Sequence, residues 1–549
     1  MMTNFRTPLD FLIQRSAEAA DRVAVIDAGV DPAITVSRGD LLHRSLGLAE
    51  ELRDIGVRKG DCLAVWLPNW TDSLVWQFAA IAVGAHVVGI NTRYNVDEIS
   101  HVLLNARPKA VAIAHGFHKL DLRERLHSAF AQAKCPSFYV AVLTGPGKAP
   151  ADPEVLKTYD VGKGVFIPSR RSEDIPPSTD PQALAVAFTT SGSTGKPKLA
   201  AHTAGAVAAQ MQAVAAFDTW IETDVILCAL PLTGVFSFIP AMTIIGAGGR
   251  CLLDPVFDAD RIISNMTRFD VTHVIGADDI IRRIADAWKA NPLPLKKWRR
   301  MLFADFNGFS NELAEWGEVT FGLRAGAVYG SSECFSLMAL RPSTEGLPRR
   351  WQGGGTPVDQ NIKVRTADPE TGEVKLPGDH GELQIKGSNV VDAYLGQPDL
   401  HRSQFTVDGW FRTGDLAVVA ADGSFDYLCR IGDSLRLRGF LVEPFEIEQR
   451  LLAHEAVDLA KIVGLRQPDG ETIAIAFVTL RAGQQVPAEA LGQWCACGLA
   501  AYKVPQAIHI IEQMPTVPGV NGAKIKAGDL REMAKILAGG KGSEPKETA

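Results

Sequence analysis

The sequence lacks the features of a zinc-binding, secreted or membrane-spanning protein. Its eight cysteines are scattered over 549 residues without the paired CxxC clusters that hold zinc, so we expect free, buried thiols. The N-terminal residues contain no apolar run of the signal-peptide type, which predicts a cytoplasmic protein. One apolar stretch, residues 73–90, is interrupted by Gln77, Gly84 and His86, and therefore predicts a helix and a strand instead of a membrane span.

The sequence also lacks an excess of basic residues. The formal net charge is −7 and the pI is about 6.0, which argues against a nucleic-acid-binding surface, because such a surface needs a basic stripe. A hydrophobic content of 46% beside 22% charged residues is typical of a packed globular core. Since 549 residues exceed a single core, we expect one large composite domain and one small domain.

The first part of the chain alternates between helical and strand patterns, which predicts a parallel sheet with crossover helices. Residues 144–182 are rich in proline, glycine, serine and charge, and we expect an irregular connection there. The expected helices are residues 41–55, 71–83 and 97–105, and the expected strands are residues 63–67, 87–90, 110–113 and 183–188.

The pattern changes twice in the second half of the chain. After Pro357, short strands with frequent glycines predict a β-barrel-like subdomain that ends near Arg430. A helix and two strands over residues 444–480 then predict a compact α+β unit. We therefore expect an N-terminal domain over residues 1–431, a C-terminal domain over residues 432–539 and a frayed tail over residues 540–549.

The most informative stretch is residues 188–202, which read FTTSGSTGKPKLAAH. Gly192 and Gly195 allow backbone N–H groups to converge on an anion, the hydroxyl side chains add donors, and Lys198 adds charge. The spacing differs from that of a Walker A loop, where a Ser or Thr stands in place of Pro197, so a P-loop NTPase is disfavoured. The stretch predicts a polyphosphate-binding loop, although taken alone it also fits a solvated surface loop.

Four further motifs follow this loop along the chain. They are Tyr329-Gly330-Ser331-Ser332-Glu333, residues 410–415 (WFRTGD), Arg430 with Asp433, and Gly522-Ala523-Lys524-Ile525. In order and spacing these motifs resemble the AMP-forming acyl-adenylate superfamily, which includes acyl-CoA synthetases, adenylation domains of peptide synthetases and luciferases. The resemblance spans nearly the whole chain. It implies an α/β fold with two α/β subdomains and a β-barrel-like subdomain, followed by a small, mobile α+β C-terminal domain.

The resemblance also implies the roles of individual residues. Glu333 is expected to hold Mg²⁺, Lys198 to bind the β- and γ-phosphates of ATP, and Lys524 to bridge the acyl carboxylate and the α-phosphate. Gly432 falls where this family pivots its small domain. The expected ATP- and AMP-binding residues are Thr190, Ser191, Gly192, Ser193, Thr194, Gly195, Lys198, Tyr329, Ser332, Asp415, Arg430 and Lys524.

Within this set, Tyr329 is expected to pack against adenine and Asp415 to accept the ribose hydroxyls, with Arg430 holding ribose and phosphate. Without the motif context, Glu333 would be read as a surface carboxylate and Lys524 as one of several lysines in a solvated tail. The sequence also departs from the family's pattern. Residues 304–308 (ADFNG) replace the usual Gly-Gly-Ala turn beside adenine, which puts the nucleotide contacts there in doubt.

Apolar residues are expected to line the acyl site, where Gly234 stands in place of the usual aromatic residue or histidine. The candidate lining is Gly234, Val235, Phe236, Phe303 and Phe335. Ser237 disfavours an α-amino acid, because amino-acid-activating relatives place an aspartate there for the ammonium group. An uncharged aromatic, alicyclic or medium-chain acid is therefore expected.

The sequence predicts an AMP-forming acid–CoA ligase that uses ATP, Mg²⁺ and coenzyme A. A ligase that loads a separate carrier protein, an oxygenase of the luciferase type and a non-catalytic nucleotide-binding module are the alternatives. The expected partners are small molecules only, without nucleic acid or a membrane span, and a homodimer stays open as the assembly.

Overall fold

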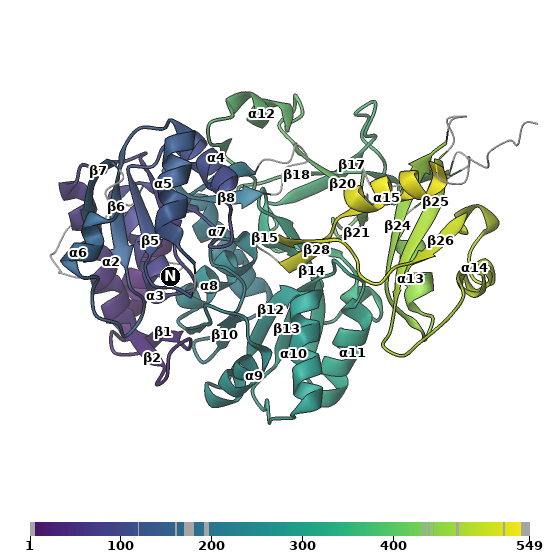
Figure 1. Cartoon of the computed structure of the whole chain (residues 1–549), viewed down its shortest axis with the longest axis horizontal. Coiled ribbons are helices and arrows are strands. Elements are labelled where there is room, and N and C mark those ends of the chain that lie inside the picture. The colour runs from purple at the N-terminus through teal and green to yellow at the C-terminus, as the bar shows by residue number, and fades with distance from the viewer. Residues whose placement is uncertain are drawn as a thin grey trace, which may run out of the picture.

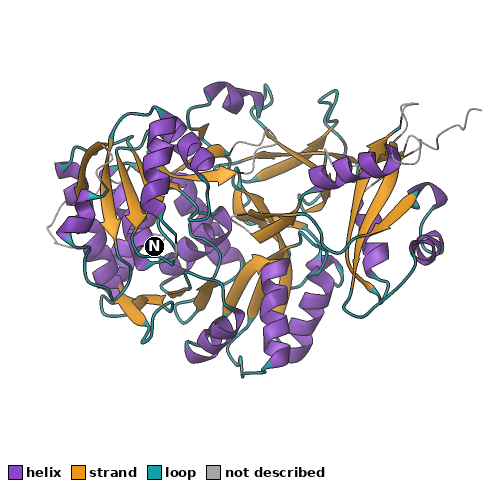
Figure 2. Ribbon diagram, in the orientation of Figure 1, coloured by secondary structure: helices purple, strands orange, loops and turns teal. Residues whose placement is uncertain are grey.

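The computed structural model describes residues 6–539 except for 119, 160–161, 169–179, 191–196, 432–434, 438–439, 443, 468–471 and 520–521. Figure 1 shows a large body, whose last strand is β21 (Phe425–Arg430), and a smaller C-terminal unit at one end. Helices pack around the sheets of the large body, as the colouring in Figure 2 makes clear. In the described part of the chain, no helix is both long and apolar enough to span a membrane.

An eight-stranded sheet forms one half of the large body, in the order β19-β9-β8-β4-β3-β5-β6-β7. Its strands are β3 (Cys62–Trp66), β4 (His86–Gly89), β5 (Ala110–Ala114), β6 (Phe138–Leu143), β7 (Gly162–Phe166), β8 (Leu184–Thr190), β9 (Lys198–Thr203) and β19 (Ala393–Tyr394). The central strands are parallel and their side chains are buried, which fits strands covered by helices on both faces. The helices of this part are α2 (Arg38–Asp54), α3 (Thr71–Val83), α4 (Val96–Ala106), α5 (Leu122–Ala133) and α6 (Pro153–Lys157).

The boundaries of these elements follow local signals in the sequence. Asn95 caps α4 and forms a capping box with Glu98, whose side chain reaches back to the cap. Gly84 ends α3 in the left-handed conformation that glycine adopts without strain. The predicted helices and strands of this region are confirmed to within a few residues.

The prediction of an irregular connection over residues 144–182 is wrong in part, because α6 and β7 lie within it. Among the described strands β7 pairs only with β6, at the edge of the sheet, and its five residues are exposed or half-buried. An edge strand of this kind carries no run of apolar residues, so the hydrophobic pattern that reveals buried strands is missing.

A thirteen-stranded sheet forms the other half, in the order β17-β18-β20-β21-β16-β15-β14-β13-β12-β10-β11-β1-β2. The strands are β1 (Val23–Asp27), β2 (Ile34–Ser37), β10 (Val225–Cys228), β11 (Arg250–Leu253), β12 (His273–Ala277), β13 (Arg300–Ala304), β14 (Arg324–Ser331), β15 (Phe335–Leu340), β16 (Gly354–Pro357), β17 (Lys363–Ala367), β18 (His380–Lys386), β20 (Phe411–Val419) and β21 (Phe425–Arg430). Its helices are α1 (Pro8–Glu18), α7 (Ala204–Phe217), α8 (Val235–Ala247), α9 (Ala259–Arg268), α10 (Asp278–Ala290), α11 (Ser310–Phe321) and α12 (Pro398–Ser403).

This second sheet changes character along its length. The strands β1, β11, β10, β12, β13 and β14 are parallel to one another, and β2 pairs antiparallel with β1. On the other side of β14, the strands β15, β16, β21, β20, β18 and β17 each pair antiparallel with their neighbours. The subdomain predicted after Pro357 takes the form of this antiparallel array, which is open because β17 ends the strand order. The mixed α/β architecture with a smaller C-terminal domain is confirmed.

The C-terminal unit is a three-stranded sheet with helices on both faces. Alternate residues of β25 point to opposite faces, so Ala476 joins the core beneath α13 and α14, whereas Phe477 joins the core beneath α15. Its elements are β22 (Leu435–Leu437), β23 (Phe440–Val442), α13 (Pro444–Leu452), β24 (Val457–Arg466), β25 (Thr472–Leu480), α14 (Ala488–Ala496), β26 (Ala507–Ile510), β27 (Thr516–Gly519), β28 (Gly522–Ile525) and α15 (Ala527–Gly539).

Specific contacts join the C-terminal unit to the large body. Arg282 on α10 pairs with Asp458 on β24 at 2.6 Å. Gly308 has a φ of +88° and approaches Leu452 so closely that a Cβ atom there would lie 2.5 Å from a leucine methyl group. The hairpin β27–β28 also lies against α10. The unit is therefore docked with its hairpin on the large body.

Candidate active site

Three parallel strands of the large sheet end at the same edge. Ala277 on β12 pairs with Ala304 on β13, and Phe303 on β13 pairs with Ala327 on β14. Asp278 and Asp305, which directly follow β12 and β13, therefore lie beside the end of β14. The carboxyl edge of a parallel sheet is where α/β proteins bind ligands. The predicted residues Tyr329, Ser332 and Glu333 lie at or just beyond this end of β14.

Tyr329, Asp415 and Arg430 form one connected group, although they are far apart in the sequence. The Tyr329 hydroxyl donates to Asp415 Oδ2 at 2.5 Å, and Arg430 Nε lies 3.0 Å from Asp415 Oδ1. Asp415 and Arg430 face each other in the pairing of β20 with β21. The hydroxyl of Thr413 further accepts from the backbone N–H of Asp415 at 3.0 Å. Tyr329 and Arg430 thus hold the Asp415 carboxylate, and Thr413 holds the backbone of the same residue.

The electrostatics of this group follow from the buried carboxylate. The negative charge of Asp415 raises the pKa of Arg430 above its usual value, so the guanidinium stays charged. Burial raises the pKa of Tyr329, and the neighbouring Asp415 raises it further, so the phenol stays a donor. The Tyr329 ring is 7% exposed and packs against Phe425 at 5.1 Å. The expected contact of this ring with adenine stays a prediction.

A second group contains Lys198 and Glu333, which are 135 positions apart in the sequence. The Lys198 ammonium lies 5.8 Å from the centroid of the Tyr394 ring. The carboxylate of Glu333 lies near the Tyr394 hydroxyl. Burial raises the pKa of that phenol most, and the negative charge of Glu333 raises it further. Tyr394 therefore stands between the two residues predicted to bind phosphate and metal.

The short strand β19 and its flanking residues connect the two halves of this group. Val391 N donates to Glu333 O at 2.7 Å, and Leu395 N donates to Leu199 O at 3.0 Å. The Asn389 side chain also donates to Cys334 O at 3.1 Å. This segment therefore ties the Glu333 turn to the strand that carries Lys198.

The remaining predicted residues are placed unevenly. Ser191, Gly192, Ser193, Thr194 and Gly195 lie outside the described residues, as does Gly432. Thr190 ends β8 and pairs with Lys198 across the loop. The carbonyl oxygen of Ser332 lies 2.7 Å from His202 Nε2. Lys524 belongs to β28, where it pairs with Val517.

The residues chosen for the acyl site are all buried. The Val235 carbonyl accepts a hydrogen bond from the Ser336 hydroxyl at 2.7 Å, which joins the start of α8 to β15. Phe335 stacks on the buried His202 at 4.1 Å between ring centroids. Phe303 and Phe236 are also buried. Whether these side chains contact an acyl group stays a prediction.

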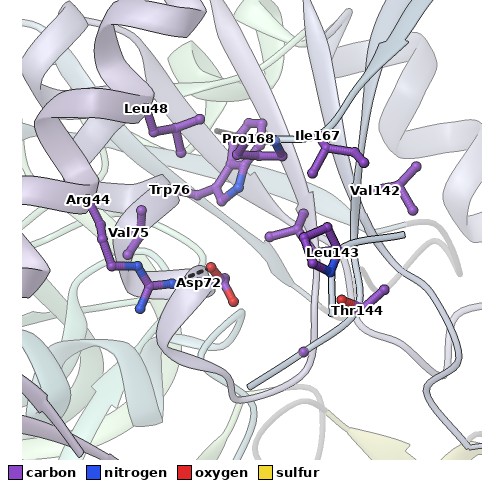
Figure 3. A pocket seen from close by; sticks show the side chains of 12 residues that line it. Arg44, Leu48, Asp72, Val75, Trp76, Val142, Leu143, Thr144, Ile167 and Pro168 are labelled. Atoms are coloured by element: carbon purple, nitrogen blue, oxygen red, sulfur yellow. Dashed lines mark hydrogen bonds and ion pairs between the residues drawn. The ribbon is translucent and has the colours of Figure 1, made fainter. Parts of the chain in front are cut away.

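Two cavities in the described structure lie away from Glu333 and Asp415. One of about 20 Å³, room for about one water molecule, is lined by Leu232, Thr233 and Phe238 next to the acyl segment. The other measures about 50 Å³ and lies beside Trp76 and the ion pair of Arg44 with Asp72, as Figure 3 shows. Neither has the size of a pocket for a drug-sized ligand.

A metal ion of the Mg²⁺ type fits the residues present at the Glu333 turn. Among the described residues, no three His, Cys, Asp or Glu side chains gather as a ready-made metal site. Mg²⁺ usually binds one or two carboxylates and takes its other ligands from phosphates and water. A single carboxylate at Glu333, in the same group as Lys198, is consistent with that preference.

Two carboxyl groups that the motifs do not include lie at the same edge. The Asp278 carboxylate accepts from the backbone N–H groups of Asn307 and Phe309 at 2.8 and 3.3 Å, and so shapes the loop that replaces the usual glycine-rich turn. Asp305 lies beside it and accepts from Gly308 N at 2.8 Å. Burial raises the pKa of Asp305 to about 8, with the Asp278 charge as the second cause.

This pair predicts a pH dependence of stability. The unfolded carboxyl of Asp305 titrates near 3.8, so between pH 3.8 and about 8 the folded state binds a proton that the unfolded state has lost. Stability should therefore fall as the pH rises through this window, by up to about 1.4 kcal/mol per pH unit. Asp305→Asn imitates the protonated acid, so its Tm relative to wild type should increase from pH 5 to pH 8.

Thermal unfolding of both proteins at half-unit pH steps measures this dependence. Asp286→Asn is the control, because Asp286 lies exposed on α10, the helix that begins at Asp278, and its removal should shift Tm equally at every pH. Parallel Tm curves for Asp305→Asn and wild type would contradict a protonated Asp305 at neutral pH.

Sequence reasoning missed Tyr394, Asp278 and Asp305. Tyr394 sits in a two-residue strand, and only the pairing of that strand with β9 places it at the site. Asp278 and Asp305 each follow a short apolar strand, which is a signal that the sequence offered. Polar residues directly after parallel strands are candidates for a ligand site.

Comparison with known proteins supports one family over nearly the whole chain. The model of the AMP-binding enzyme family matches residues 12–395, and the model of the AMP-binding enzyme C-terminal domain matches residues 446–518. A 4-coumarate–CoA ligase 5 of Oryza sativa subsp. japonica is 27% identical over 96% of this chain and 94% of its own length. A feruloyl-CoA synthase of Amycolatopsis sp is also 27% identical, over 90% of this chain and 92% of its own length.

Solved structures support the same fold. ATP-bound MatB from Rhodopseudomonas palustris superposes with a TM-score of 0.81 at 22% identity, covering 96% of this chain and 99% of that one. The two family models match the large body and the C-terminal unit in turn, in agreement with the order of the motifs. The chain belongs to the AMP-binding enzyme family.

Proposed function

We propose that this protein is an ATP-dependent acid–CoA ligase, which forms acyl-CoA, AMP and pyrophosphate through an acyl-adenylate. The observation that carries the proposal is the convergence of Lys198 and Glu333 on Tyr394, beside the group formed by Asp415, Arg430 and Tyr329. One group offers a cation and a carboxylate for polyphosphate with Mg²⁺. The other offers a fixed carboxylate for ribose hydroxyls.

The first half-reaction would join the acid to AMP. A carboxylate oxygen of the acid attacks the α-phosphorus of ATP, the bond from that phosphorus to the bridging oxygen breaks, and pyrophosphate leaves with its charge. Two anions must meet in this step, so fixed positive charge and oriented donors lower the barrier. Lys198 would neutralise the leaving phosphates and Lys524 would contact the carboxylate and the α-phosphate. Bound Mg²⁺, held by Glu333, would screen the phosphate charges.

The second half-reaction would transfer the acyl group to the thiol of coenzyme A. The thiolate attacks the acyl carbon, the bond from that carbon to the phosphate oxygen breaks, and AMP leaves. We assign residues 1–431 to the domain that binds ATP and acid, and residues 432–539 to a mobile domain that carries Lys524, with Gly432 as the pivot. The relatives that act on coumarate and ferulate favour an aromatic acid among the expected substrates.

The proposal is tested by following both half-reactions separately. Purified protein is incubated with ATP, Mg²⁺ and single acids, and exchange of labelled pyrophosphate into ATP is measured before coenzyme A is added. Exchange that depends on the acid, followed by CoA-dependent release of AMP, is expected. Exchange without any CoA-dependent thioester would indicate transfer to a carrier protein instead.

The acyl pocket gives a prediction about substrate size. Gly234 caps the start of α8, directly before Val235 and Phe236, and brings no side chain to that place. Gly234→His and Gly234→Trp should exclude ring-sized acids and leave turnover of acetate or propionate unchanged or improved. Each apolar methylene is worth only ~1–3 kcal/mol in such a pocket, so the loss should increase with the size of the acid.

The measurement is kcat/KM over acids from two carbons to a phenyl or cyclohexyl ring, for wild type and both variants. An equal proportional loss for all acids would show that Gly234 is needed by the backbone, and the inference of a roomy pocket would fail.

A further inference from the structure

Tyr394 lies between Lys198 and Glu333, but the chemistry derived above gives it no role. Its side chain is 3% exposed. Its hydroxyl forms no hydrogen bond of good geometry with the described residues, although the Glu333 carboxylate lies close enough to accept one. A buried hydroxyl without a hydrogen bond destabilises the folded state. A structural role therefore does not explain why a tyrosine, and not a phenylalanine, stands here.

The position of Tyr394 is fixed by the backbone and not by its hydroxyl. Tyr394 pairs with Ala200 on β9. On either side of β19, the backbone N–H groups of Val391 and Leu395 donate to the carbonyl oxygens of Glu333 and Leu199. The ring then lies beneath the Lys198 ammonium at a distance that allows a cation–π interaction. Ring and hydroxyl thus face two different residues of the candidate site.

We propose that Tyr394 is a positioning residue of the polyphosphate and Mg²⁺ site. The ring supports the Lys198 ammonium, and the hydroxyl donates to one oxygen of the Glu333 carboxylate when nucleotide binds. The other carboxylate oxygen then remains directed at the metal. Partners of metal-binding carboxylates commonly fix the orientation of the ligand in this way. The inference rests on the proposed function, because it assumes that Glu333 and Lys198 meet Mg²⁺ and ATP.

Tyr394→Phe separates the two roles, because it removes one oxygen and keeps the ring. The Mg²⁺ concentration for half-maximal pyrophosphate exchange should rise about 10-fold, as is typical when the partner of a metal ligand is removed. The rise in Tm that MgATP produces should shrink as well, and this readout needs no turnover. The Tm of the free protein should stay the same or increase, because no hydrogen bond of good geometry is lost.

Tyr394→Leu removes the ring too, so the KM for ATP should rise in addition, even at saturating Mg²⁺. Transfer of a preformed acyl-adenylate to coenzyme A should be unaffected by either variant, because that intermediate has no β- or γ-phosphate. Tyr139→Phe is the matched control. Tyr139 lies on β6, near the end of its sheet opposite β19, and loses the same single oxygen.

Two results would overturn the inference. A fall of several degrees in the Tm of free Tyr394→Phe would show that the hydroxyl holds the fold. An unchanged Mg²⁺ requirement and an unchanged MgATP-induced rise in Tm would show that the hydroxyl does not act on the site. Failure of the proposed function is distinguishable, since wild-type protein would then show no acid-dependent exchange with any acid tested.

Discussion

Lys524→Ala is expected to slow acid-dependent ATP–pyrophosphate exchange by ~10²-fold or more. The charge of this lysine would be aimed at the negative charge that develops on the carboxylate and the α-phosphate, and loss of such a donor has that size of effect. The structure places Lys524 on β28, whose hairpin lies against α10 of the large body. In this docked arrangement β28 contacts α10, the helix that begins at Asp278 at the carboxyl edge of the sheet.

Transfer of a preformed acyl-adenylate to coenzyme A should proceed normally in Lys524→Ala, if rotation of the small domain removes the lysine before that step. Lys526→Ala serves as the control, because Lys526 is exposed and pairs with Asp529 at 3.4 Å at the start of α15. Both variants are compared with wild type in each half-reaction. If Lys526→Ala proved to be the slow variant, the assignment of the catalytic lysine would be wrong by two positions.

The sequence predicted the elements of the large body well where strands are buried. The strands β3, β4 and β5 are continuous apolar runs between helices with clear caps, so periodicity identifies both their type and their limits. Pattern alone did not reveal that residues 354–430 would join the large sheet as an open antiparallel array. Strand order depends on pairing between distant segments, which a single sequence does not display.

The sequence also predicted only part of the candidate site. Motif spacing singled out Asp415, Arg430 and Tyr329 separately, and the structure brings their side chains into contact. The sequence could not reveal Tyr394, because its importance depends on its place between Lys198 and Glu333. Side chains that act by holding others in place have no spacing rule, since their partners can lie anywhere in the chain.

Asp415→Asn is expected to lower kcat/KM for ATP by about 10²-fold with little change in Tm. Two hydrogen bonds from ribose to a charged acceptor would be weakened, and bonds to charged groups contribute about 1.5–3 kcal/mol each. The asparagine oxygen can still accept from the Tyr329 hydroxyl, which lies 2.5 Å from Asp415 Oδ2. The ion pair with Arg430 is lost, but the variant also removes the charge of a carboxylate that is only 7% exposed, and water can solvate the Arg430 side chain, which is 55% exposed.

Asp415→Ala gives the contrast that separates binding from folding. It leaves the hydroxyl of the buried Tyr329 without its acceptor, so unfolding should become easier by about 1–3 kcal/mol in addition to the loss of activity. Adding Tyr329→Phe to Asp415→Ala should recover most of that stability and none of the activity, because it removes the unpaired hydroxyl but restores no ribose acceptor. Stability is measured by thermal unfolding and activity by kcat/KM for ATP. Both are measured for wild type, Asp415→Asn, Asp415→Ala and the double variant with Tyr329→Phe.

The two half-reactions distinguish Asp415 from Lys524. The ribose is present in ATP, in the acyl-adenylate and in AMP, so Asp415→Asn should slow adenylation and thioester formation to a similar extent at limiting nucleotide or adenylate. Lys524→Ala should slow only the first. An Asp415 variant that impaired adenylation alone would mean that this carboxylate acts on the departing pyrophosphate or its metal. The assignment of the ribose site to the group of Tyr329, Asp415 and Arg430 would then be wrong.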